Sequence, residues 1–116
     1  MNIDKLKAQL TNKYKGIKTL LLTETEEYIS LDMMEIDKEY RKQGIGTFVM
    51  IHLIRYADSV GKEIILSPGV NDDRRGTTSR GRLVKFYKQF GFVENKGRNK
   101  DFTKKGGSMF RKPIKK

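Results

Sequence analysis

A turn with two glycines, between an apparent strand and an apparent helix, constrains this chain more than any other feature. Its six residues are Arg41-Lys42-Gln43-Gly44-Ile45-Gly46. Glycines at such a turn let backbone N–H groups come close to a bound group, and the helix start adds partial positive charge. The turn therefore predicts a strand-turn-helix unit that holds an anion such as a pyrophosphate.

Hydrophobic spacing on both sides of the turn predicts alternating helices and strands. Helices are expected at 2–13, 45–60 and 83–90, and strands at 17–24, 27–36, 64–66, from 92 and at 109–110. The short connection after residue 24 indicates a hairpin, and the β-α-β order around the turn makes strands 27–36 and 64–66 parallel. The fold class is therefore α/β, a mixed sheet with helices on both faces.

Length and composition favour a small domain without metal or disulfide chemistry. The 116 residues show no linker, so one domain over 1–116 is expected, with a basic C-terminal segment at 96–116. The absence of cysteine and the single histidine, His52, exclude disulfides and argue against zinc. No apolar run approaches a membrane span and the N-terminus lacks a signal-peptide core, so a cytoplasmic protein without a membrane partner is expected.

The charges are divided unevenly along the chain, whose net charge is +11. Residues 20–39 hold seven acids against Lys38 alone, and residues 96–116 hold nine bases against Asp101 alone. The acidic stretch suits a cationic partner, and the basic end suits an anionic one such as nucleic acid.

Two common phosphate-binding motifs do not fit the glycine turn. The dinucleotide fingerprint needs a third glycine where Val49 stands, and the P-loop needs a Gly-Lys-Ser/Thr that is absent. The turn and a second motif instead resemble the GNAT superfamily of acetyl-CoA-dependent N-acetyltransferases. Residues 41–46 match every fixed position of its motif Arg/Gln-x-x-Gly-x-Gly/Ala, and Phe86-Tyr87-Lys88-Gln89-Phe90-Gly91-Phe92 resembles its later helix end.

The resemblance covers roughly residues 17–95 and implies a compact GNAT-like fold with a shortened N-terminal part. Many members carry another strand and helix there, which often shape the acceptor pocket. Many also carry an asparagine where Arg80 stands in this chain. Small members of this kind occur in phage genomes, and some resemble modifiers of host defence nucleases.

Acetyl-CoA is the co-substrate that the resemblance implies. Its pyrophosphate would bind the backbone amides from Gln43 through Gly44, Ile45 and Gly46 to Thr47, with charge from Arg41 and Lys42 and a hydroxyl from Thr47. Its pantetheine arm would pair with the backbone of 33–36, including Met34 and Ile36, in a slot left where this strand splays from 64–66. Arg75, Arg80 or Arg82, in or beside an enlarged loop at 71–81, would contact the 3′-phosphate or line a protein or nucleic-acid interface.

The same resemblance makes Tyr87 the acid that protonates the leaving CoA thiolate, and a tyrosine's ordinary pKa of about 10 suits this role. A carboxylate would take the proton of the attacking amine, and Asp32 and Glu35 are equal candidates. They point to opposite faces of a regular strand, so only one of them is expected to face the site, and a bulge would change which one. His52, in mid-helix, is interpreted as a packed or surface imidazole.

The leading interpretation is an N-acetyltransferase that passes acetyl directly to an amine, which requires no covalent enzyme intermediate and fits a chain without cysteine. The acidic stretch favours a cationic acceptor: a protein lysine, a protein N-terminus or a small amine. The alternatives are a nucleic-acid- or nucleoprotein-binding module that uses the basic C-terminal segment, and an inactive CoA-binding protein. The sequence leaves the acceptor and the oligomeric state open.

Overall fold

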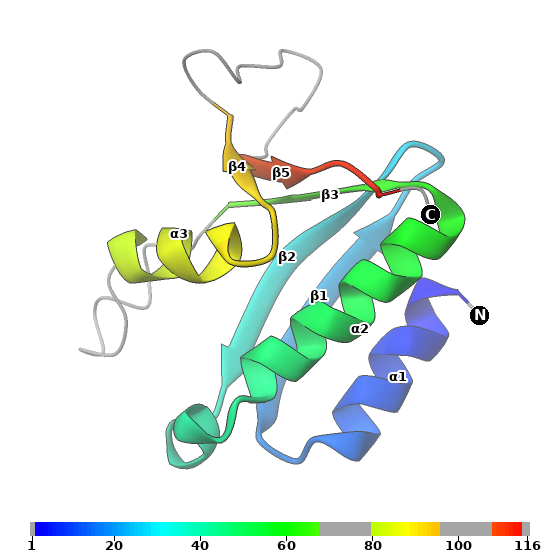
Figure 1. The fold of residues 1–116 in the computed structure, drawn as a ribbon. Coiled ribbons are helices and arrows are strands. Elements are labelled where there is room, and N and C mark those ends of the chain that lie inside the picture. Colours follow the sequence, from blue (N-terminus) through cyan, green and yellow to red (C-terminus); the bar gives the residue numbers. More distant parts are fainter. Residues whose placement is uncertain (1, 68–79, 96–107, 115–116) are drawn as a thin grey trace.

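The computed structural model describes residues 2–67, 80–95 and 108–114. Three helices, five strands and one 3₁₀ turn (Figure 1) follow each other as α1 (Ile3–Lys13), β1 (Ile17–Glu24), β2 (Tyr28–Ile36), η1 (Lys38–Gln43), α2 (Ile45–Val60), β3 (Glu63–Leu66), α3 (Arg80–Lys88), β4 (Val93–Glu94) and β5 (Met109–Arg111). No helix in these ranges is long and apolar enough to cross a membrane.

The five strands form one mixed sheet in the order β1-β2-β3-β5-β4. β1 and β2 form the expected antiparallel hairpin, and β2 and β3 are parallel, as predicted. β5 lies between β3 and β4 and is antiparallel to both. From β2 through β3 to β4, each strand therefore lies further along the sheet in one direction. The last strand, β5, then inserts between β3 and β4.

All three helices contribute to a single hydrophobic core. Leu10 of α1, Val49 of α2 and Tyr87 of α3 pack in one cluster with Leu20 of β1 and Leu31 of β2. The cluster residues on the strands lie on one face of the sheet. Leu31 of β2 pairs with Leu22 of β1 and with Leu66 of β3, and all three side chains belong to the cluster or pack against it. The α/β class with a mixed sheet is confirmed, but the described helices cover one face rather than both. The connections β2–α2–β3 and β3–α3–β4 move in the same direction across the sheet. Right-handed crossovers of this kind place both helices, α2 and α3, on the same face of the sheet.

A bulge interrupts the pairing of β1 with β2. Leu21 pairs with Met33 whereas the next residue, Leu22, pairs with Leu31, so Asp32 is an extra residue in β2. A bulge breaks the regular alternation of side chains between the two faces of a sheet. Asp32 and Met33, adjacent in sequence, are consequently both exposed to solvent.

Glycines with positive φ bound both ends of α2. Gly44 precedes the helix with φ +75° and Gly61 follows it with φ +68°, a region that side chains other than glycine rarely adopt. The N–H of Gly61 bonds back to Ala57 and Asp58, which closes the helix. The backbone at each end of this helix therefore depends on glycine.

A polar cluster joins the end of β1 to the second half of α2. Glu24 accepts hydrogen bonds from the Tyr56 hydroxyl and from Lys62 Nζ, both at 2.7 Å. Burial alone would raise the pKa of Glu24, but the hydrogen bonds from Lys62 and Tyr56 and the charge of Lys62 outweigh it and lower that pKa. Burial, with the Glu24 carboxylate beside it, raises the pKa of Tyr56 to about 12.

Glu24→Gln is expected to destabilise the protein at neutral pH by about 1 kcal/mol, because it removes a charged acceptor from two hydrogen bonds. A carboxylate whose pKa is lowered by folding stabilises the protein above its ordinary pKa, here 4.5, and loses that contribution as the pH falls through the lowered value. Urea unfolding of wild type and variant should therefore differ at pH 7 and converge at acid pH, as the pH falls through the lowered pKa of Glu24. Glu27→Gln, at the exposed hairpin tip, is the control. An equal difference at both pH values would contradict the proposed coupling.

Candidate active site

β2 runs beyond its pairing with β3, and the two strands diverge at that point. β2 has nine residues and four of them, 28–31, pair with 63–66 of β3, so five residues from Asp32 to Ile36 extend past that ladder. Figure 1 shows β2 continuing toward η1 while β3 turns away from it. Five extended residues span about 16 Å, a length comparable to an extended pantetheine arm. β2 therefore extends past the end of β3, at the place where the sequence predicts a slot for the pantetheine arm.

The start of α2 offers backbone donors at the end of this stretch. Gly44 caps the helix without a side-chain hydrogen bond, and its carbonyl accepts the first intrahelical bond from Phe48 N–H at 3.1 Å. The N–H groups of a first helical turn have no partner within the helix, and they carry the positive end of the helix dipole. Gln43, Gly44 and Thr47 are exposed whereas Ile45 is buried in the core, so the turn is anchored with its polar side outward.

Gly46 brings the two sequence motifs together. A Cβ placed on Gly46 would lie 3.5 Å from Cζ of Phe86 on α3 and 3.8 Å from Cε of Met34 on β2. These are ordinary van der Waals distances, so alanine would fit here and a larger side chain would displace its neighbours. The glycine turn, the stretch of β2 beyond β3 and the aromatic helix thus meet at one point.

Tyr87 lies in the same region but is mostly enclosed. Its side chain is 7% exposed, and its ring packs edge-on against Phe86 at 5.2 Å and Phe92 at 5.9 Å between centroids. Tyr87 therefore belongs to the core that joins α3 to the sheet, and it lies next to the residue that contacts Gly46. The rings fix the orientation of its side chain.

The two candidate carboxylates lie on the same face of the sheet, opposite the helices. Glu35 pairs with Thr19, next to the Leu20–Met34 pair whose side chains pack in the core. The bulge turns Asp32 to the same side, where its carboxylate accepts hydrogen bonds from Thr23 Oγ1 at 2.5 Å and Ser30 Oγ at 2.6 Å. The expectation that they point to opposite faces is wrong, because it assumes a regular strand.

The structure describes only some of the other residues that were predicted for the site. Ile36 is half-buried against the core, and Arg82 is exposed on α3. Arg80 begins α3, and the side chains of Arg41, Lys42 and Arg80 lie outside the described part of the chain, as does the loop up to residue 79. His52 is half-buried with Nε2 3.5 Å from the Tyr14 hydroxyl, as expected of a packed imidazole. In the described ranges no group of three His, Cys, Asp or Glu is placed to hold a metal ion.

Gly16 supports the glycine turn, and the sequence analysis missed it. Its carbonyl accepts a hydrogen bond from Asp37 N–H at 2.7 Å. A Cβ on Gly16 would lie 2.6 Å from Cδ1 of Ile45 and still closer to the Tyr40 side chain. Only a glycine lets the chain before β1 pass this close to η1 and α2, and no local motif marks this long-range approach.

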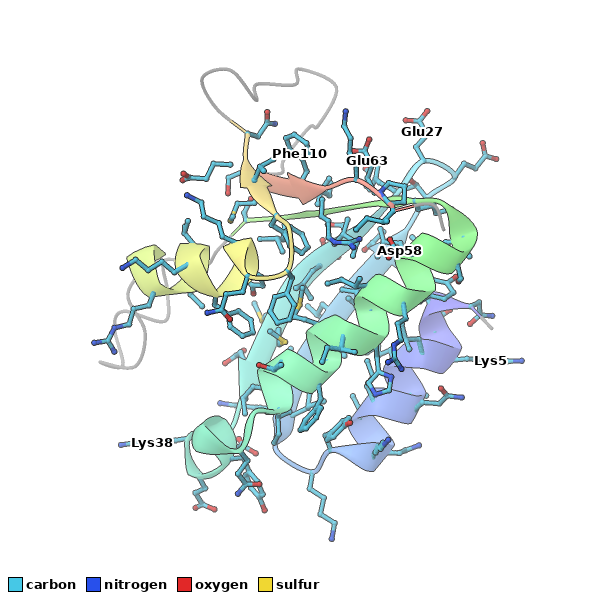
Figure 2. All side chains as sticks on the ribbon, viewed as in Figure 1. Lys5, Glu27, Lys38, Asp58, Glu63 and Phe110 are labelled. Carbon is cyan, nitrogen blue, oxygen red and sulfur yellow. The ribbon has the colours of Figure 1, made fainter. Side chains whose placement is uncertain are left out.

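Arg111 is a second residue that the sequence analysis missed. It is 6% exposed, and its guanidinium donates to both carboxylate oxygens of Asp58, at 2.8 and 3.3 Å. Its Nε donates to the Phe90 carbonyl at 2.9 Å, just after α3. Figure 2 shows Asp58 at the opposite end of α2 from Lys38 of η1. Arg111 therefore ties the end of α2 to the end of the helix that carries Tyr87.

Comparison with known proteins agrees with this geometry. A family model described as "Acetyltransferase (GNAT) domain" matches residues 8–94. The crystal structure of the anti-CRISPR protein AcrVA5 is similar with a TM-score of 0.63 at 25% identity, over 84% of this chain and 90% of that one. The structure of Ard1 from Thermoplasma volcanium has the same fold, with a TM-score of 0.57 at 14% identity over 98% and 82%. No curated protein matches the chain.

The matched residues make up well over half of the chain and include the glycine turn, the stretch of β2 beyond β3 and Tyr87. This chain therefore belongs to the GNAT acetyltransferases and is an acetyl-CoA-dependent N-acetyltransferase.

Proposed function

We propose that this protein transfers acetyl from acetyl-CoA directly to the amine of a cationic acceptor. The observation that carries the proposal is the meeting of Met34, Gly46 and Phe86 where β2 runs on without β3. One end of that region offers uncapped helix amides for a pyrophosphate, and the rest offers a strand edge for an extended arm.

The order of these parts gives a direction to the bound acetyl-CoA. With the pyrophosphate at Gly44, the pantetheine arm runs back along β2 from Ile36 toward Asp32. The thioester then lies where β2 and β3 diverge, beside the pair formed by Leu31 and Leu66. Asp32 is the first residue beyond that pair, whereas Glu35 lies nearer the pyrophosphate.

This placement favours Asp32 over Glu35 as the general base. Asp32 takes a proton from the acceptor ammonium, directly or through water, and the free amine attacks the thioester carbonyl. The tetrahedral intermediate collapses with loss of the CoA thiolate, which takes a proton from the Tyr87 hydroxyl. The amine nitrogen, which still carries an extra proton after attack, returns one to the Tyr87 oxygen directly or through water, so that the neutral amide forms and Tyr87 is regenerated. Thr23 and Ser30 hold the Asp32 carboxylate in one orientation.

Asp32→Asn is expected to lower kcat about 100-fold at pH 7 without a comparable change in the KM for acetyl-CoA, because it removes the base but not the cofactor site. Glu35→Gln on the same strand face is the matched control and should change kcat only slightly. Steady-state CoA release with spermidine and a lysine peptide measures both variants. The opposite ranking would transfer the role to Glu35.

Tyr87→Phe is expected to lower kcat about 100-fold while acetyl-CoA binding stays near the wild-type value. The ring contacts with Phe86 and Phe92 are kept in this variant, so the packing of α3 should survive. Calorimetric titration of acetyl-CoA and turnover of the same amine separate binding from chemistry. Unchanged turnover would remove Tyr87 from the mechanism.

The direct test of the proposed function is acetylation of a panel of amines. The panel includes spermidine, lysine peptides and proteins, each scored by mass spectrometry for acetylated product. AcrVA5 is an anti-CRISPR protein, so CRISPR effector proteins belong in the panel. Acetyl-CoA binding without any acetylated amine would instead support an inactive CoA-binding protein.

A further inference from the structure

The face of the β1–β2 hairpin opposite the helices carries an exposed apolar pair. Leu21 on β1 and Met33 on β2 are 43% and 42% exposed, and they pair directly across the two strands. Side chains that pair in this way lie within about 5 Å of each other at Cβ, so the two form one patch. In Figure 1 the described helices lie over the other side of these strands.

Carboxylates flank this apolar pair on the same face. Asp32 precedes Met33 at the bulge, and Glu35 follows it by two residues, opposite Thr19. Single exposed apolar side chains such as Val60 and Ile114 are ordinary on a protein surface. The pair of Leu21 and Met33 differs because it is contiguous, bordered by acids and adjacent to the proposed base.

We propose that this surface, the Leu21–Met33 face, docks a protein segment in which the acetylated lysine lies beside an apolar side chain. The inference rests on the proposed function and narrows its acceptor class. The carboxylates of Asp32 and Glu35 complement a cationic segment, and the apolar pair complements an aliphatic neighbour of the lysine. A small polyamine offers the charge but has no side chain to cover Leu21.

The Leu21–Met33 face lies beside the proposed reaction site, and this supports a lysine-containing segment as the molecule that it binds. Met33 is adjacent to Asp32, the first residue beyond the β2–β3 pairing, so a segment lying on Leu21 and Met33 reaches the predicted thioester within a residue or two. A second copy of the chain is the competing occupant, and the oligomeric state distinguishes it.

Leu21→Ser tests the proposal, because Leu21 lies on β1, outside the parts assigned to acetyl-CoA and to chemistry. The probes are two synthetic peptides of equal length and charge, one with its single lysine flanked by leucines and one with glycines, together with spermidine. Wild type should favour the leucine peptide about 10-fold in kcat/KM, and Leu21→Ser should remove most of that preference. Activity on spermidine and the KM for acetyl-CoA should stay unchanged.

Two control variants separate docking from general effects. Val60→Ser removes a side chain that is 41% exposed at the far end of α2 and should keep the peptide preference. Leu21→Met keeps an apolar side chain and should keep the preference as well. Circular dichroism and thermal melting establish that each variant is folded.

The outcomes separate this inference from the function on which it rests. Acetylation of spermidine and both peptides with equal kcat/KM, or a preference that survives Leu21→Ser, would overturn the docking surface alone. Failure to acetylate any amine would overturn both the docking surface and the proposed function. A dimeric wild type that becomes monomeric in Leu21→Ser, with the peptide preference intact, would assign the face to self-association and overturn the proposal.

Discussion

Gly44→Val is expected to abolish measurable acetyl-CoA binding, raising Kd more than about 100-fold, while the protein stays folded. Gly44 has φ +75°, and a β-branched side chain there costs about 1–2 kcal/mol or forces the turn to move. Moving the turn misaligns the first amides of α2, which the proposed pyrophosphate site uses together. Isothermal titration calorimetry with acetyl-CoA measures the effect.

Gly61→Val supplies a matched control on the same helix. Gly61 has φ +68°, and a Cβ there would meet nothing within 4 Å, so the substitution introduces similar backbone strain without a steric clash. Both variants should lose similar unfolding free energy, but Gly61→Val should bind acetyl-CoA like wild type. Equal binding losses in the two variants would mean that general destabilisation, rather than the pyrophosphate site, explains the effect.

Arg111→Ala is expected to lower the unfolding free energy by about 3 kcal/mol, because the partly buried Asp58 carboxylate loses the guanidinium that neutralises its charge. The Asp58 carboxylate loses two hydrogen bonds, and the Phe90 carbonyl loses its donor. Chemical denaturation measures the change. Arg111→Lys should recover only part of the loss, because an ammonium cannot make the paired hydrogen bonds of a guanidinium.

The neighbouring residue separates this effect from a general loss of charge. Lys112 is exposed, and Lys112→Ala removes the same charge with little expected change in stability. Arg111→Ala should also lower turnover more than acetyl-CoA binding, because it loosens the end of α3 that carries Tyr87. Wild-type stability in Arg111→Ala would contradict the role assigned to the Asp58 pair.

Local patterns predicted the elements well. The strand at 17–24 and the helix at 45–60 have the expected bounds, and the hairpin and the parallel β2–β3 pair follow from short-range rules on connection length and handedness. Hydrophobic periodicity and glycine positions carry this information in the sequence. The glycine turn was identified for the same reason: its function depends on residues adjacent in sequence.

Features that depend on distant residues were not predictable. The position of β5 between β3 and β4 is decided by pairing across the sheet, and the contact of Gly16 with Ile45 is decided by packing. The bulge at Asp32 adds one residue to a pattern of period two, and a single residue leaves too weak a signal to detect. That one residue is the reason why the two candidate carboxylates lie on the same face.

A crystal structure with acetyl-CoA tests the account most directly. It should show the pyrophosphate on the amides that begin α2, the pantetheine arm along residues 32–36, and the thioester between Asp32 and the Tyr87 hydroxyl. A cofactor bound away from Gly44 and residues 32–36 of β2, or a thioester out of reach of both Asp32 and Tyr87, would contradict the account.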